Sequence, residues 1–257
     1  MGKSKLGLPL EYKKLPEYFD AHNVCDDTNA KNSVIEKLLE EHKAETVLDL
    51  TCGTGSQVFF LTKNGYKMTG ADFSPALLRL ARERALREKI DVKFIDGDMR
   101  TLKVGHFDAV ITIFNAVGHL TKAGFEKAMR NIRRNLKDGG LYIFDIFNLE
   151  AMTNNAVDDF AMDLHRSVND TKIHNIQHSE IDRENGRLTS YDSYTIQKNA
   201  GKSKRFNHKF SLQIYTAKEL KEILTKNGFE TIGQYGMDGS NFLEDKTTCI
   251  LTVARKK

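Results

Sequence analysis

The sequence predicts an α/β fold in which helices pack against a mostly parallel β-sheet, and three observations support this prediction. From Thr46 onward, short apolar runs alternate with longer amphipathic stretches, as expected of βα units. The first apolar run leads directly into the glycine-containing turn at residues 51–55. The chain contains further apolar runs of strand length, which bring the predicted total to seven strands with helices between them.

Composition bounds the class of protein. With 257 residues, 40% hydrophobic and 29% charged, the chain has enough material for one folded domain, and we expect a single domain over residues 1–257. The 39 Lys and Arg residues against 35 Asp and Glu residues leave +4, which is too small a charge to indicate a nucleic-acid partner. Residues 1–14 mix lysine and leucine and lack the unbroken apolar core typical of a signal peptide, and no apolar run approaches membrane-spanning length. We therefore expect a cytoplasmic monomer or homodimer.

The first five strands are predicted at residues 47–50, 67–71, 92–95, 107–114 and 141–146. The run at 107–114 is nearly continuous in apolar residues, which is typical of a central strand. The helices between the strands carry start and stop signals. Ser74 followed by Pro75 starts one helix, and Asn64–Gly65 ends another. A further helix is predicted over 125–136, ended by the glycines at 139 and 140.

The end of the chain predicts one more helix and two more strands. Thr216 and Glu219 form a capping-box pattern at the start of the helix, and Asn227–Gly228 ends it. Residues 229–235 and 247–253 are the last predicted strands.

Residues 148–212 differ in character and predict an inserted antiparallel β cap. Residues 184–187 (ENGR) form a hairpin-turn signal, and the residues that follow it alternate with period two, as do residues 206–214. The insertion leaves the parallel sheet at a carboxyl end, where open α/β sheets bind ligands, so we expect it to roof a pocket. Lysine and glycine residues at 198–209 predict a mobile loop in this cap.

The turn after the first strand indicates close approach to a ligand. Gly53 and Gly55 follow Asp49 in the pattern D-x-x-x-G-x-G, and glycines at these positions let the backbone approach a bound molecule. A dinucleotide fingerprint would place a third small residue three positions after Gly55, where this chain has Val58. The pattern therefore disfavours a nicotinamide dehydrogenase.

Two further acids follow the next two strands. Asp72 ends the second strand, and an ionised carboxylate there can accept hydrogen bonds from both hydroxyls of a ribose. Asp98 follows the third strand, where a carboxylate can accept a hydrogen bond from the exocyclic amine of an adenine. Phe73 and Met99 would then cover the two faces of the ring. Three acids at the ends of successive strands, beside a glycine turn, predict one nucleotide-like site.

These motifs together resemble class I S-adenosylmethionine-dependent methyltransferases. The resemblance is carried by residues 47–55 (VLDLTCGTG), 70–74 (GADFS), 97–99 (GDM), 107–110 (FDAV) and the late helix–strand unit at 215–229, and it covers about residues 34–254. It implies a Rossmann-like seven-stranded sheet whose last strand is antiparallel. It also implies S-adenosylmethionine as cofactor and S-adenosylhomocysteine as product, without a metal. The residues that it assigns to the cofactor are Asp49, Thr51, Gly53, Gly55, Asp72, Phe73, Gly97, Asp98, Met99 and Phe114.

Residues 114–120 (FNAVGHL) normally face the reacting methyl group in this family, and here they resemble the corresponding stretch of glycine-type N-methyltransferases. We predict Asn115 and His119 as catalytic residues, with His119 accepting a proton from the acceptor. The alternative is that His119 only caps the next helix or packs in the loop. Tyr18 and Phe19, in an N-terminal lid segment at 1–33, resemble the aromatic lid of some relatives, and Tyr18 joins the predicted cofactor contacts. The alternative for both residues is packing in the core.

The resulting hypothesis is methyl transfer to a nitrogen or oxygen atom of a small molecule. Two alternatives stay open. One is methylation of RNA or protein through the loop at 198–209, and the other is a cofactor-binding partner subunit without catalysis. Among the minor candidates, Cys52 is expected to pack rather than to act as a nucleophile, and we expect surface positions for His165, Arg166, His174 and His178.

Overall fold

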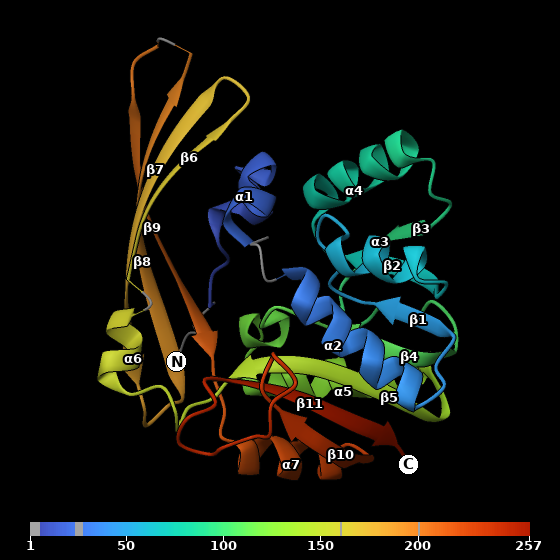
Figure 1. Cartoon of the computed structure of the whole chain (residues 1–257). Helices are drawn as coiled ribbons and strands as arrows, with labels where there is room; N and C mark the ends of the chain where they lie inside the picture. The colour runs from blue at the N-terminus through green and yellow to red at the C-terminus, as the bar shows by residue number, and fades with distance from the viewer. Residues whose placement is uncertain (1–5, 24–27, 160, 200) are drawn as a thin grey trace.

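The computed structural model describes residues 6–23, 28–159, 161–199 and 201–257, and it contains two separate β-sheets (Figure 1). The larger sheet has seven strands in the order β10-β11-β5-β4-β1-β2-β3. Its strands are β1 (Thr46–Asp49), β2 (Lys67–Asp72), β3 (Lys93–Asp96), β4 (Phe107–Thr112), β5 (Leu136–Phe147), β10 (Phe229–Tyr235) and β11 (Cys249–Lys256). Strands β1 to β5 pair in parallel, whereas β11 is antiparallel to both β5 and β10. The predicted fold class, including the antiparallel last strand, is confirmed.

Helices cover both faces of this sheet. Helices α2 (Thr28–Glu41), α3 (Ser56–Lys63) and α4 (Pro75–Glu88) contribute apolar residues to one core cluster, and α5 (Lys122–Asn135) and α7 (Ala217–Lys226) contribute to another. The predicted helix caps are present. The Ser74 hydroxyl accepts the Leu77 N–H, and Thr216 and Glu219 form a reciprocal capping box. Local sequence therefore sets where these helices start, and the sheet supplies the surface that their apolar faces bury.

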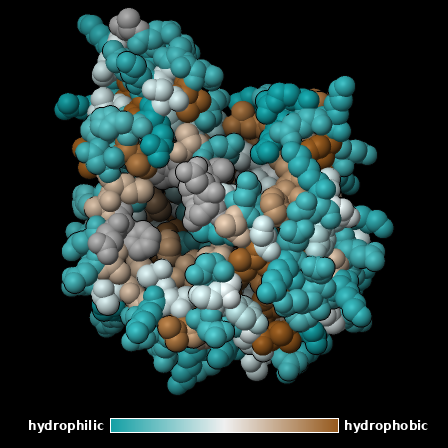
Figure 2. Space-filling model, in the orientation of Figure 1, coloured by the Kyte–Doolittle hydropathy of each residue, from teal (hydrophilic) through white to brown (hydrophobic). Residues whose placement is uncertain are grey.

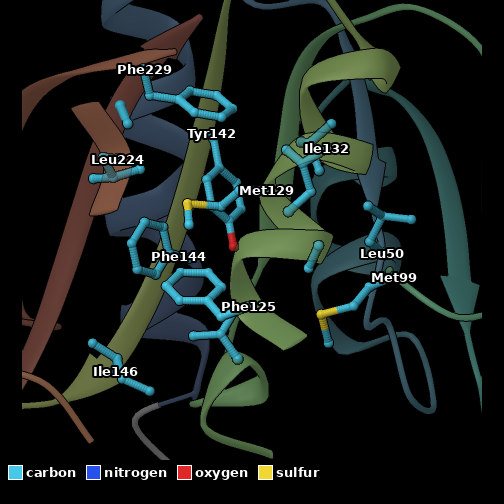
Figure 3. Close-up of a cluster of buried hydrophobic side chains, with 14 of the residues drawn as sticks. Leu50, Met99, Phe125, Met129, Ile132, Tyr142, Phe144, Ile146, Leu224 and Phe229 are labelled. Atoms are coloured by element: carbon cyan, nitrogen blue, oxygen red, sulfur yellow. The ribbon is translucent and has the colours of Figure 1, made fainter. Parts of the chain in front are cut away.

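Figure 3 shows the core between β5, α5 and α7. Phe125 on α5 is fully buried, and its ring lies 5.5 Å from that of Phe144 and 5.7 Å from that of Tyr215. Tyr142 stacks on Phe144 at 4.6 Å, and its hydroxyl pairs with that of Thr112 at 2.8 Å. This core holds β4 and β5 together beneath the carboxyl edge of the sheet.

Strand β5 begins earlier than predicted. We predicted a helix that continues to 136 and a strand that begins at 141, but α5 ends at Asn135 and Leu136 already pairs with Phe107. The sheet register then shifts, so that Ala109 pairs with Leu141. Residues 137–140 are accommodated as an irregularity within the strand, because Gly139 takes a φ of 72° that favours glycine.

The smaller sheet confirms the antiparallel insertion. Its strands are β6 (Met162–Val168), β7 (Thr171–Asp182), β8 (Arg187–Lys198) and β9 (Lys204–Gln213), in that order, preceded by the short helix α6 (Asn154–Asp159). In Figure 1 this sheet stands upright beside the seven-stranded sheet. The loop predicted at 198–209 is wrong from residue 204 onward, because β9 pairs with β8 from Ile196–Lys204 to Arg187–Gln213. The period-two pattern at 206–214 outweighs the lysine and glycine content there.

The N-terminal segment lies between the two sheets (Figure 1). It contains the 3-10 turns Leu10–Tyr12 and Pro16–Tyr18, followed by α1 (Phe19–Asn23). Residues 1–5 and 24–27, which belong to the predicted lid at 1–33, lie outside the described residues. Within the described part of the chain, every helix is too short or too polar to cross a membrane.

Candidate active site

A cavity of about 1090 Å³ lies where the carboxyl ends of β1, β2 and β4 meet the N-terminal segment and β9. In Figure 2 the surface is hollowed between the upright sheet and the body of the molecule. Seven of the predicted site residues line this cavity: Thr51, Asp72, Phe73, Asp98, Met99, Phe114 and His119. Distant parts of the sequence therefore converge on one enclosed space, as the strand-end argument predicts.

The glycine turn follows β1 and is held by Asp72. Gly53 and Gly55 have φ values of 53° and 93°, a region in which side chains are strained. A Cβ atom on Gly55 would lie 2.7 Å from the Phe59 ring, so the position has no room for a side chain. The Asp72 carboxylate accepts the N–H groups of Gly53 at 2.9 Å and Ser74 at 2.8 Å. Burial raises the pKa of Asp72 to about 6, which leaves it mostly ionised at neutral pH.

Asp49 lies beneath the turn and does not line the cavity. It is 1% exposed, and one of its carboxyl oxygens accepts the Thr51 N–H at 3.0 Å. Its other oxygen is buried and has no hydrogen-bond partner among the described residues. Burial raises the pKa of Asp49 to about 8, with the neighbouring Asp72 charge adding to the shift. In this structure Asp49 supports the turn from below.

The segment after β3 brings Asp98 and Met99 to the cavity wall. Asp98 is paired with Arg100 through both Nε and the guanidinium end, and this pairing lowers the pKa of the carboxyl. Gly97 lies behind this wall, where a Cβ atom would meet Leu102 at 2.7 Å. Arg100 also lines the cavity and was not predicted.

Two buried asparagines on α5 fix this segment, and the sequence analysis missed both. The Asn131 side chain donates to the carbonyls of Met99 at 3.0 Å and Leu102 at 2.7 Å. Asn135 accepts the Val104 N–H at 2.7 Å and donates to the same Leu102 carbonyl at 2.9 Å. Asparagine at these two helix positions, one turn apart, is the signal that could have indicated them.

The chain turns sharply after β4. Phe114 and Asn115 have φ values of 62° and 55°, which are unusual for residues other than glycine and mark local strain. The buried Asp145 holds this turn by accepting the Asn115 N–H at 2.9 Å. The Asn115 side chain accepts the Phe147 N–H at 3.2 Å and does not line the cavity. The turn directs Phe114 and the following 3-10 turn, Ala116–His119, toward the cavity.

His119 lies on the cavity wall in contact with Tyr12 of the N-terminal segment. Its Nε2 is 3.4 Å from the Tyr12 hydroxyl, and its Nδ1 is buried without a partner among the described residues. Burial lowers the pKa of His119 to about 4, so the imidazole is neutral at pH 7 and presents a lone pair.

The N-terminal residues at the cavity differ from the one we predicted. Tyr18 points away from it, donates its hydroxyl to the Thr171 carbonyl at 2.9 Å, and packs with Ile173 and Tyr194. Phe19, the second aromatic residue of the predicted lid, lines the cavity, and so does Tyr12, which we did not predict. The Tyr12 ring stacks on Phe73 at 5.7 Å, the ring that we predicted to cover an adenine.

Hydrogen bonds tether this segment to both sheets. Glu11 accepts the Tyr194 hydroxyl of β8 at 2.7 Å, and the Leu8 carbonyl contacts the Nε2 of His208 on β9 at 2.6 Å. On the other side, the Ser74 hydroxyl donates to the Tyr12 carbonyl at 2.5 Å. The segment thus closes the gap between the two sheets over the cavity.

Comparison with known proteins agrees with this arrangement. Residues 47–140, which include the glycine turn, Asp72 and Asp98, match the family described as methyltransferase domain. Over 221 residues the chain is 24% identical to a putative methyltransferase of Geobacillus sp. (strain WCH70), covering 79% of this chain and 83% of that protein. It is 34% identical over 131 residues to a glycine/sarcosine N-methyltransferase of Parasynechococcus marenigrum, covering 48% of this chain and 45% of that protein.

A solved structure shows the same fold over the whole chain. The sugar N-methyltransferase of Streptoalloteichus sp. superposes with a TM-score of 0.74 at 19% identity, covering 100% of this chain and 98% of that one. The family match shows a methyltransferase domain over residues 47–140, and the superposition shows that the fold of the chain is that of a known methyltransferase.

Proposed function

We propose that this protein is an S-adenosylmethionine-dependent methyltransferase that transfers a methyl group to a nitrogen or oxygen atom of a small molecule held in the cavity between the two sheets. The observation that carries the proposal is the position and size of that cavity at the carboxyl ends of the parallel strands. Its volume of about 1090 Å³ is at the upper end for small-molecule sites, so it has room for a cofactor and a compact acceptor together. The N-terminal segment and His208 of β9 form the walls of this cavity on the side away from the seven-stranded sheet.

The residues around the cavity fit the cofactor. Asp72 uses one acceptor site of each carboxylate oxygen on a backbone N–H and keeps others for ribose hydroxyls. Phe73 and Met99 supply apolar surfaces for the adenine, with Asp98 beside them. Thr51 lines the same cavity, and its buried hydroxyl has no hydrogen-bond partner among the described residues, so a small rotation of this side chain would offer it to a polar ligand. Gly53, Gly55 and Gly97 do not line the cavity, and their role is to let the backbone pass close to the bound cofactor.

Bound S-adenosylmethionine supplies a methyl group on a positively charged sulfur, which is already activated for displacement. The protein's task is to align the acceptor with that group and to exclude water. Phe114 and His119 stand on the wall where the acceptor would lie, and the turn held by Asn115 and Asp145 sets their direction. We therefore assign His119 as the group that contacts the acceptor and Asn115 as a positioning residue.

The low pKa of His119 favours an amine over a hydroxyl as acceptor. An imidazole with a pKa of about 4 is a weak base. It therefore fits an amine that binds in its neutral form, because the lone pair of such an amine can attack the methyl group without prior deprotonation. Two of the similar proteins are named as N-methyltransferases, of glycine/sarcosine and of a sugar, and this also favours a nitrogen acceptor. A hydroxyl acceptor would need a stronger base than this residue provides.

Replacing His119 with alanine should lower kcat by about 100-fold, the lower end of the range for a positioned acid or base. Cofactor affinity should change less than about threefold, because His119 is assigned to the acceptor side. Between pH 6 and 8 the wild-type kcat should not change through titration of this imidazole, which stays neutral throughout. His106→Ala, at an exposed histidine before β4, is the matched control. An unchanged kcat in His119→Ala would assign His119 to packing alone.

A methyl-transfer assay with labelled S-adenosylmethionine tests the proposed function. Small primary and secondary amines, including amino sugars and amino acids, are screened first, then small alcohols, then RNA and protein at equal concentrations of acceptor groups. Transfer to one or more small amines is the expected result. Transfer only to RNA or protein would contradict the proposal, and cofactor binding without transfer to any acceptor would favour a non-catalytic partner subunit.

A further inference from the structure

Two histidines and an aspartate gather on the outer face of the four-stranded sheet. Asp163 and His165 lie two residues apart on β6, and His174 on β7 is paired directly opposite His165. Because side chains alternate between the faces of a strand, all three project from the same face. Their potential ligand atoms, one from each residue, lie within 4.8 Å of one another.

Both imidazoles already approach the same carboxylate oxygen of Asp163. Asp163 Oδ1 lies 2.6 Å from His174 Nε2 and 3.5 Å from His165 Nε2. The two imidazole rings stack at a centroid distance of 4.0 Å and an interplanar angle of 13°. Ligand atoms around a tetrahedral zinc ion are about 3.3 Å apart, given metal–ligand distances of about 2.0–2.2 Å. The present separations reach 4.8 Å, so binding requires the three side chains to rotate toward one another.

This cluster is separate from the active-site cavity. Ile173 and Asn175 alternate with His174 along β7 and are buried on the opposite, inner face. The cavity is lined from that inner side, by His208 of β9, and includes none of the three residues. A ligand on the outer face would therefore leave the cofactor site open.

We propose that Asp163, His165 and His174 bind one divalent transition-metal ion of the zinc type. Two imidazoles with one carboxylate are a ligand set that such ions prefer, whereas calcium and magnesium require mostly oxygen ligands. Lys172 is exposed on the same face of β7, two residues from His174, and its positive charge opposes a non-specific attraction of cations to this surface. Affinity rests on the imidazole nitrogens. This proposal is independent of the proposed function, and it departs from our prediction of a protein without a metal.

Bound metal would join the edge strand β6 to β7. Strand β6 has only one neighbour in the sheet, and its central residues are exposed. Three protein ligands leave one position of a tetrahedral ion for water or for a group from another molecule. The ion would therefore stabilise the outer edge of the cap.

Calorimetric titration of tag-free protein with zinc chloride tests the site. We expect one ion per chain with a dissociation constant in the micromolar range, and no measurable binding of magnesium or calcium. His174→Ala and Asp163→Asn should each weaken zinc binding by at least 10-fold. His178→Ala is the matched control, because this histidine projects from the same face of β7 but stacks on Tyr191. It should bind zinc as the wild type does.

Thermal unfolding provides a second readout that does not depend on activity. Zinc should raise the melting temperature of the wild type and of His178→Ala, but not that of His174→Ala. No zinc binding by the wild type would overturn the proposal. Equal binding by His174→Ala would also overturn it, because the ion would then lie elsewhere, for example at a cysteine.

Discussion

Replacing Asp72 with alanine is expected to weaken S-adenosylmethionine binding by about 100-fold. Asp72 is 2% exposed, lines the cavity at the end of β2, and in our proposal accepts the ribose hydroxyls. Hydrogen bonds to a charged group contribute about 1.5–3 kcal/mol each, and 100-fold corresponds to about 2.7 kcal/mol. The loss of the two hydrogen bonds to the ribose, partly compensated by hydrogen bonds to water, should therefore cost a free energy of binding close to this value. Calorimetry at pH 7.5 measures it directly.

Asp96→Ala is the matched control for this experiment. Asp96 is paired with Asp72 in register on β3, but it is exposed and forms an ion pair with Arg82 outside the cavity. Its replacement should change cofactor affinity less than about twofold. Circular dichroism of Asp72→Ala must show a folded protein, because Asp72 also holds the glycine turn. A folded Asp72→Ala variant with wild-type affinity would remove Asp72 from the cofactor site.

The same residue predicts a pH dependence of cofactor binding. Burial raises the pKa of Asp72 to about 6, so its carboxylate is lost as the pH falls through 6. Affinity for the cofactor should therefore decrease below pH 6 and be constant above pH 7. Asp72→Asn should bind more weakly and lack this transition.

Phe125→Ala is expected to reduce the free energy of unfolding by about 3–5 kcal/mol, the range for buried aromatic residues. Phe125 is 0% exposed and contacts Phe144 and Tyr215, so truncation leaves a cavity in the core that supports β4 and β5. Phe206→Ala, at an aromatic residue that is 43% exposed, should cost less than about 1 kcal/mol. Urea unfolding followed by circular dichroism compares the two. Equal losses would contradict this description of the core.

The sequence predicted the parallel sheet well because its signals are local. Apolar runs, the glycine turn and the caps at Ser74 and Thr216 act within a few residues, and parallel strands place their carboxyl ends at one edge. Asp72, Asp98 and the turn therefore converge as expected. Strand β6 was missed because it has no strong alternation, and it forms only by pairing with β7.

The residues missed around the cavity depend on contacts between distant segments. Tyr12, which was not predicted, lines it together with Phe19, and Tyr18 does not, because the N-terminal segment is tethered to both sheets, through Glu11 and Tyr194 on one side and Ser74 on the other. These contacts join residues up to 183 positions apart, and no local pattern predicts which of several aromatic side chains faces inward.

The most direct test of the central claim is calorimetric titration of the wild-type protein with S-adenosylmethionine and with S-adenosylhomocysteine. We expect one site per chain for both compounds, with dissociation constants in the micromolar range. The absence of binding of either compound to a folded sample would contradict the account. The glycine turn and its strand-end acids would then belong to a site for a different nucleotide.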